Sequence, residues 1–376
     1  MRICLPYVVD AVSERQMSMT AASMFWLDAL RNCEIDRPLA LPFDRHRVSD
    51  EHRTGRGASV TFDFGESLSQ RFLTYASANN TTPEHLALAS YYAFLFKLTN
   101  GEQDLCVGMN THGRYKAELC SVIGMFVNAI PLRCQIDPRQ SFTQLVERVH
   151  VMATRSFEHS YFPLQRILAQ HPLASKPAFL DTSFEFVSAA TEDIPDQITL
   201  GDAHILALPF SIKIGTDEIV SKFDFALNVR HDMLTGQLSC TINASFDLFD
   251  ATTVNRIGQR FLFALEQLFA SNANRAMRPI YELSLILPDE ASLIQSINNT
   301  QVSFSRADCI HHEFACRANE QPQKMAVELD EQSLTYSELL YYVQRLALHL
   351  VINHNVTSGD IVCQCVERSL SMVKLS

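Results

Sequence analysis

Apolar residues recur at strand or helical spacing along most of this chain, and the two patterns alternate. Val60–Phe64 alternates between apolar and polar side chains, which predicts a strand. A buried helix is predicted next, because Thr82 can cap it, Pro83 suits its first position, and Leu86–Leu98 is apolar on most sides. Asn100-Gly101 then provides a helix end.

The later part of the pattern predicts two more helices and a hairpin. Phe142–Phe157 is amphipathic, and Thr252–Phe269 also has helical spacing. Two strand-like runs, Ile219–Val229 and Leu238–Phe246, flank a turn at Leu234-Thr235-Gly236, which is typical of a β-hairpin. Alternating strands and helices indicate a layered α/β domain and leave the strand order open.

The densest run of β-branched and aromatic residues is Val122–Arg133, with the sequence VIGMFVNAIPLR. It predicts a buried strand that contains Gly124 and Asn128, and Leu105–Asn110 predicts another strand before it. Residues 189–203 are acidic and polar, so we expect a loop there.

The pattern also predicts a domain boundary. Pro279–Glu290 shows no long period and is predicted to be connecting chain, and a new unit starts near Ile310. We therefore expect one domain at residues 1–290, a linker at 291–309 and a second unit at 310–376.

Composition narrows the function classes. Hydrophobic residues make up 47% of the 376 residues, enough for a substantial core, and the formal net charge of −11 argues against a nucleic-acid partner. No signal peptide is convincing, and no apolar run approaches the roughly 20 residues that span a bilayer. We expect a cytoplasmic protein without a membrane partner.

The ten cysteines do not indicate a metal site. Cys309, His311, His312 and Cys316 lie close in sequence, but their spacing fits no common zinc pattern. We expect free thiols in a reducing compartment and no bound metal.

One span carries a family signature. Gly113-Arg114, then Glu118, then the Val122–Arg133 run together resemble the "R…E…IGxFVN…R" signature of condensation domains from nonribosomal peptide synthetases. Further segments resemble other motifs of that family in the family's order: Phe25-Trp26-Leu27, Leu41–Arg45, His159–Leu164, His171–Phe179, Ser221–Phe225 and Phe246–Asp250, with a poorer match at Tyr7 and Asp10.

The end of the chain resembles the opening of an adenylation (AMP-binding) domain. The segments that carry this second resemblance are Ile310–Phe314, Pro322, Met325-Ala326-Val327, Leu334–Leu339, Leu346-Ala347, Gly359-Asp360 and Glu367-Arg368-Ser369. In assembly-line synthetases adenylation follows condensation, so the order of the two resemblances supports both.

The resemblance implies a fold and a chemistry. Condensation domains resemble chloramphenicol acetyltransferase, with two lobes that meet at a V and a tunnel between them. An amine on one carrier domain attacks a thioester on another, and the amide remains on the acceptor. The resemblance therefore implies carrier domains as partners, phosphopantetheine on those carriers, and ATP with Mg²⁺ in a complete adenylation domain, none of them bound by this chain alone.

The family's catalytic motif, HHxxxDG, is not found in these residues. The His-His pair is His311-His312, which is followed by Glu313 and no Asp-Gly and lies in the adenylation-like segment. The Ser-, Thr- and Gly-rich phosphate loop of adenylating enzymes is also not found. We therefore expect a fragment that holds the second condensation lobe and the start of an adenylation domain, is inactive alone, and has no catalytic residue of its own.

Gly124 and Asn128 are the residues expected to face the substrate tunnel. The alternative for Asn128 is a strand-end amide that satisfies backbone groups. Arg114 and Glu118 are expected to form a structural ion pair on a loop.

Two further residues are expected to be structural. His159 lies near the carrier-facing side or is a solvated helix end, and Asp224 is expected at a strand edge. Two other interpretations of the whole chain stay open: a related acyltransferase that uses unrecognised residues, and a module that docks carrier proteins without catalysis.

Overall fold

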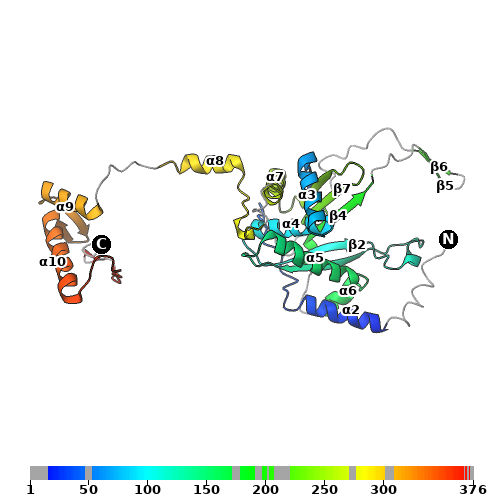
Figure 1. Cartoon of the computed structure of the whole chain (residues 1–376), viewed down its shortest axis with the longest axis horizontal. Helices are drawn as coiled ribbons and strands as arrows, with labels where there is room; N and C mark the ends of the chain where they lie inside the picture. Colours follow the sequence, from blue (N-terminus) through cyan, green and yellow to red (C-terminus); the bar gives the residue numbers. More distant parts are fainter. Residues whose placement is uncertain are drawn as a thin grey trace. The chain divides into compact units, whose positions relative to one another are not determined.

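The computed structural model describes residues 16–46, 53–171, 178–190, 197–200, 203–206, 221–270, 277–300, 309–367, 369–370 and 372. The chain divides into two compact units, Met1–Leu293 and Ile294–Ser376 (Figure 1). The motif residues Tyr7 and Asp10, and residues 172–177 of the His171–Phe179 motif, lie outside the described residues.

The first unit contains one mixed sheet and the helices that pack on it. Its elements are α2 (Gln16–Ala29), β1 (Gly57–Asp63), α3 (Gly65–Ala78), α4 (Pro83–Leu98), β2 (Asp104–Thr111), η1 (Ala117–Leu119), β3 (Asn128–Gln135), α5 (Phe142–Glu158), α6 (Leu164–Ala169), η2 (Ala178–Asp181), β4 (Thr182–Ala189), β5 (Gln197–Leu200), β6 (Ala203–Leu206), β7 (Phe225–Asp232), β8 (Leu238–Ser245), α7 (Ala251–Leu268) and η3 (Ile280–Glu282).

The sheet has six strands in the order β1-β8-β7-β4-β2-β3. β4 runs parallel to both β7 and β2, and the outer pairs are antiparallel. Helices cover the sheet: α4 contacts β2 and β4, α5 contacts β3, and α7 contacts β1 (Figure 1). Along β8, Leu238, Cys240, Ile242 and Ala244 are buried while the residues between them are half-buried, because successive side chains point to opposite faces.

Two helices begin at strong sequence signals. Thr82 caps α4, since its hydroxyl oxygen accepts a hydrogen bond from the His85 backbone N–H, and this helix is buried along most of its length. Ser141 and Gln144 form a reciprocal capping box at the start of α5. The predicted helices at 82–98, 142–157 and 252–269, and the predicted hairpin, now seen as β7–β8, are confirmed.

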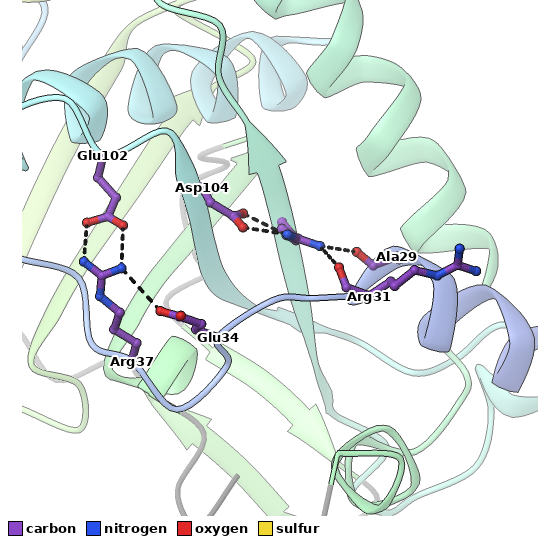
Figure 2. Close-up of polar contacts among 7 residues, drawn as sticks. Ala29, Arg31, Glu34, Arg37, Glu102 and Asp104 are labelled. Atoms are coloured by element: carbon purple, nitrogen blue, oxygen red, sulfur yellow. Dashed lines mark hydrogen bonds and ion pairs between the residues drawn. The ribbon is translucent and has the colours of Figure 1, made fainter. Parts of the chain in front are cut away.

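An arginine fixes the loop after α2 to the edge of the sheet. Arg133 on β3 donates to both carboxylate oxygens of Asp104 on β2, at 2.8 and 2.6 Å. Its remaining nitrogen donates to the carbonyl oxygens of Arg31, at 2.6 Å, and Ala29, at 3.4 Å (Figure 2). A bidentate, partly buried pair of this kind holds its geometry better than a fully exposed ion pair does.

The strand prediction for the Val122–Arg133 run was wrong in its first half. Regular pairing begins only at Asn128, and before it Ile123, Met125 and Val127 are 72%, 88% and 57% exposed. These three side chains are exposed and lie before the first paired residue of β3, so the apolar composition did not translate into strand structure here.

One element was not predicted, and two other expectations were wrong. A helix, α3, follows Phe64 where no element was predicted. The described parts of the predicted loop at 189–203 include β5, which pairs with β6 as a hairpin. The predicted connecting segment at 279–290 is structured, because Ile280, Leu283 and Leu287 are buried and η3 and α8 (Pro288–Ile297) occupy it.

After the end of α8, the described residues of the second unit form α9 (Ile310–Glu320), β9 (Met325–Leu329), β10 (Gln332–Thr335) and α10 (Tyr336–His354), with β9 and β10 paired as a hairpin. A capping box of Thr335 and Glu338 begins α10. Many large apolar side chains of α10 are exposed, among them Tyr341, Leu348 and Ile352. Across both units, no described helix is long and apolar enough to cross a bilayer.

A histidine pair between α4 and α5 predicts a pH-dependent stability. The Nδ1 atoms of His85 and His150 lie 2.9 Å apart, and burial together with His150 lowers the pKa of His85 to about 4. The unfolded chain therefore binds more protons than the folded one below about pH 6.5, so acid destabilises the fold. We expect His85 to account for a loss of ~1–2 kcal/mol between about pH 7 and pH 5.

The comparison variant for this prediction is His85→Gln. Burial raises the pKa of the neighbouring Glu84, which acts in the opposite direction, but Glu84 is present in both proteins. Urea unfolding at the two pH values should show a smaller loss for the variant. Equal losses in the two proteins would contradict the assignment to His85.

Candidate functional site

The parallel strands β2 and β4 separate soon after they meet. Their pairing is limited to Gly108↔Ser183 and Met109↔Phe184, whereas β4 and β7 pair along their whole length. A cavity of about 380 Å³ opens where they part. Its lining comes from several elements: Arg53, Gly108, Met109, Asn110, Ala129, Leu164, Leu180, Asp181, Ser183, Lys222 and Phe223.

Gly108 allows η2 to approach β2 at the floor of this cavity. A Cβ at this position would lie 3.2 Å from the Phe179 carbonyl oxygen and 3.5 Å from a Leu180 methyl group. A larger side chain would therefore push η2 away from the strand. Met109, Leu164, Leu180 and Phe223 make most of the wall apolar.

Charged groups gather at one side of the cavity. Arg53 forms a hydrogen-bonded ion pair with Asp181 and lies 3.6 Å from Asp224. Burial alone would lower the pKa of Arg53, but the Asp181 hydrogen bond and the charges of Asp224, Asp181 and Asp247 outweigh it and raise the pKa above its ordinary value. Lys222 is exposed and lies over the Phe223 ring, 5.4 Å from its centroid.

Asn128 uses its whole amide to hold the turn before α6. Its Nδ2 donates to the carbonyl oxygens of Ser160 and Phe162, both at 2.8 Å. Its Oδ1 accepts from the Leu164 backbone N–H at 3.2 Å. Asn128 therefore does not present its amide to the cavity, while its neighbour Ala129 and its partner Leu164 line that cavity.

Arg114 does not pair with Glu118, and that prediction was wrong. Its guanidinium donates to the carbonyl oxygens of Val122, at 3.1 Å, and Gly124, at 3.4 Å, and lies 4.4 Å from the centre of the Phe126 ring. Within the described part of the chain, no ion pair joins Arg114 to Glu118, whose side chain is exposed on η1.

Backbone packing explains why Arg114 turns this way. Gly113 has a positive φ of 65°, and a Cβ there would overlap the Phe126 carbonyl group. The chain at Gly113 thus lies directly against the 122–127 segment, and Arg114 folds over it. Gly124 itself is exposed on that segment.

His159 caps the C-terminal end of α5 and packs on α2. Its ring stacks on Phe25 with centroids 4.3 Å apart, and its Nδ1 hydrogen-bonds the Arg155 carbonyl oxygen at 2.9 Å. Its own carbonyl oxygen accepts from Trp26 Nε1 at 3.1 Å. These contacts make His159 a helix-end residue in the packing of two helices.

Asp224 lies just before β7, as a strand-edge residue does. Its N–H donates to the Asp181 carbonyl oxygen at 2.8 Å, and its carbonyl oxygen accepts from the Ser245 N–H at 3.0 Å. It therefore joins η2 to the β7–β8 pair, beside the cavity.

The predicted residues fall into two groups, and none of them is itself in the cavity lining. Arg114, Gly124, Asn128 and His159 belong to one connected region of loops and turns, and Asp224 belongs to the charged group. The sequence reasoning missed Arg53, Gly108 and Asn110, which line the cavity. Lys222 belongs to the Ser221–Phe225 motif, but the sequence predicted no function for it. Only the fold shows that it lies at the rim of the cavity.

Among the residues that the structure describes, no histidine lines the cavity, and no three or more His, Cys, Asp or Glu side chains form a group suited to a metal ion. The four Cys and His residues of the 309–316 segment lie exposed around α9.

The sequence profile described as "Condensation domain" matches residues 6–292. The chain belongs to the condensation-domain family. The matched span covers the six-stranded sheet and its helices, so the condensation domain holds the whole cavity. Among curated relatives, a linear gramicidin synthase of Brevibacillus parabrevis is 30% identical over 89% of this chain, which corresponds to 6% of that protein.

Another relative agrees with this membership, and two solved structures share the fold. Phosphinothricin tripeptide synthetase PhsB of Streptomyces viridochromogenes is 30% identical over 89% of this chain and 27% of its own length. A four-domain nonribosomal peptide synthetase bound to AMP and glycine superposes with a TM-score of 0.61 at 21% identity, over 90% of this chain and 25% of that chain. The X-domain from teicoplanin biosynthesis superposes with a TM-score of 0.58 at 19% sequence identity, over 74% of this chain and 60% of that chain. The two structures show a shared fold, and the chain spans only a small part of the curated relatives.

Proposed function

We propose that the first unit is the C-terminal lobe of a condensation domain in a nonribosomal peptide synthetase. The observation that carries this proposal is the cavity where β2 and β4 separate, which is apolar inside and has Lys222 at its rim. Its partners are carrier domains that bring acyl and aminoacyl thioesters. An amine attacks the thioester carbonyl carbon, the C–N bond forms, and the carrier thiol leaves.

The shape and charge of the cavity suit one carrier-borne arm. Apolar side chains such as Met109 and Leu180 accommodate an acyl chain, and exposed Lys222 can pair with the phosphate of a phosphopantetheine arm. Arg53 is already paired with Asp181, so its role is to hold η2 beside β7. Positioning of the two reactants is the main contribution expected from such a site.

The proton acceptor for this reaction is proposed to come from a first lobe that carries HHxxxDG. Two features support a two-lobed site: no histidine lines the described cavity, and the 122–127 segment exposes its apolar side chains. Gly124 lies on that exposed segment, so we assign it to contact with the first lobe. Asn128 is a positioning residue that fixes the turn next to Leu164.

The second unit is proposed to be the opening of an adenylation domain. The family match ends at residue 292, whereas the alignment to bacitracin synthase 1 of Bacillus licheniformis covers 95% of this chain. The domain limits proposed from the sequence, 1–290 and 310–376, are consistent with a division of the chain at Leu293. ATP and Mg²⁺ belong to a complete adenylation domain and are not assigned to residues here.

An amide-formation assay tests the proposal. Purified chain is mixed with acyl-loaded and aminoacyl-loaded carrier proteins, with and without a separately produced first lobe that carries HHxxxDG. We expect amide product only when both lobes are present. Product from the chain alone would favour an acyltransferase that acts by itself, and carrier binding without product in either mixture would favour a docking module.

A further inference from the structure

A second cavity, of about 260 Å³, lies between the loop after α2 and the start of β2. Its lining includes Cys33, on the loop, and Cys106, on β2. Cys106 is only 8% exposed, whereas Cys33 is half-buried and reachable from the cavity. The two thiols line the same cavity, and each shifts the pKa of the other, although they lie far apart in sequence.

The loop that carries Cys33 is held in place from both sides. Arg37 lies between the carboxylates of Glu34 and Glu102, with N–O distances of 3.3 and 3.4 Å (Figure 2). The carbonyl oxygen of Arg31 accepts a hydrogen bond from Arg133, which is also paired with Asp104. These contacts hold the loop that carries Cys33 against the cavity that Cys106 also lines, within reach of the positive charge of Arg133.

The surroundings of the pair favour the thiolate at Cys33 and the thiol at Cys106. The Cys106 side chain lowers the pKa of Cys33, and burial, Asp104 and Glu34 oppose this effect while Arg133 supports it. The Cys33 side chain and the burial of Cys106 raise the pKa of Cys106 well above its ordinary value. Cys33 is thus the more nucleophilic sulfur at neutral pH, because the thiolate is the reactive form.

We propose that Cys33 and Cys106 form an oxidisable thiol pair, which a peroxide closes into a disulfide between the loop after α2 and strand β2. Such a link would fix the loop to the sheet covalently, in addition to the Arg133 contacts. The site is separate from the cavity between β2 and β4, and it requires no second lobe.

The reaction balances in two steps with hydrogen peroxide as the oxidant. The Cys33 thiolate attacks one peroxide oxygen, the O–O bond breaks, and Cys33 sulfenic acid and hydroxide form. The Cys106 sulfur then attacks the Cys33 sulfur, the S–S bond forms, and the sulfenic oxygen leaves as water with the Cys106 proton. Two thiols are oxidised, and one peroxide is reduced to water.

Other described cysteines provide internal comparisons. Burial raises the pKa values of Cys134 and Cys240 to about 12, so these thiols should react slowly with peroxide. Cys120 is exposed on the loop after η1 and offers a matched accessible thiol. If accessibility alone decided reactivity, Cys120 would be modified before the half-buried Cys33.

The experiment uses the full chain treated with hydrogen peroxide, followed by maleimide blocking, proteolysis and mass spectrometry. We expect a cross-linked peptide that joins Cys33 to Cys106, its loss on reduction, and its absence in Cys33→Ser and Cys106→Ser. In Cys106→Ser, Cys33 should stop as the sulfenic acid or proceed to higher oxides. In Cys120→Ser the cross-link should form as in the unaltered chain.

A second measurement is independent of the variants. Alkylation of the untreated chain by a limiting amount of iodoacetamide should modify Cys33 several-fold faster than Cys120. Modification of Cys120 first, or peroxide treatment that leaves Cys33 and Cys106 unlinked while the fold is intact by circular dichroism, would overturn the proposal.

Discussion

Replacing Asn128 with Ala is expected to lower the free energy of unfolding of the first unit by about 2–3 kcal/mol. The substitution removes the donors to the Ser160 and Phe162 carbonyl oxygens and the acceptor for the Leu164 N–H. Phe162 and Ile167 next to these groups are buried, so water cannot replace all three hydrogen bonds. Urea denaturation followed by circular dichroism measures the loss.

Two further variants make this expectation specific. Asn128→Asp keeps the acceptor for Leu164 but turns a carboxylate toward two carbonyl oxygens, so it should destabilise at least as strongly as Ala. Asn79→Ala removes an exposed amide with one backbone hydrogen bond, at 2.9 Å to the Tyr75 carbonyl oxygen, and should cost only about 0.5 kcal/mol. An Asn128→Ala loss no larger than the Asn79→Ala loss would refute the role given to Asn128.

Trp26→Ala is expected to destabilise the first unit even more than Asn128→Ala, by about 4 kcal/mol. Trp26 is fully buried, its ring meets Phe25 edge-on, and its indole N–H donates to the His159 carbonyl oxygen. The substitution leaves a large cavity where α2 meets the end of α5, and it also leaves that carbonyl oxygen without its donor.

Trp26→Phe helps to separate these two causes, because it removes the indole donor completely but loses only part of the packing volume. We expect a loss of about 2 kcal/mol for this variant, between the values for the unaltered protein and Trp26→Ala. Thermal melts of the three proteins provide the comparison. A Trp26→Ala melt that matches the unaltered protein would show that α2 does not belong to the core of this unit.

Helices with local end signals could be predicted from the sequence. Thr82, Pro83 and the Asn100-Gly101 pair mark the two ends of α4 within the chain itself, and Asn100 and Gly101 do adopt positive φ values. The β7–β8 hairpin was equally local, since Gly236 with its φ of 68° permits the turn. In contrast, α3 is rich in polar residues, and its buried face of Leu68, Phe72 and Ala76 is visible mainly once the sheet is known.

The site was harder to predict because it joins distant segments. Arg53, Asp181 and Asp224 meet only when η2 and β7 are placed side by side, and nothing local in the sequence relates Arg53 to either carboxylate. The strand prediction for residues 122–127 was wrong for a different reason. An apolar composition predicts that side chains will be buried. It does not indicate whether they are buried against the segment's own sheet or against another surface.

The central claim, that the cavity between β2 and β4 receives a carrier-borne arm, is tested most directly by the charge at its rim. In the two-lobe amide-formation assay, Lys222→Glu should lower kcat/KM by about tenfold, because it replaces the partner of the phosphate with a repelling charge. Lys324→Glu, which makes the same change at an exposed position of the second unit, should leave the rate unchanged. Equal rates for Lys222→Glu and the unaltered protein would contradict the claim.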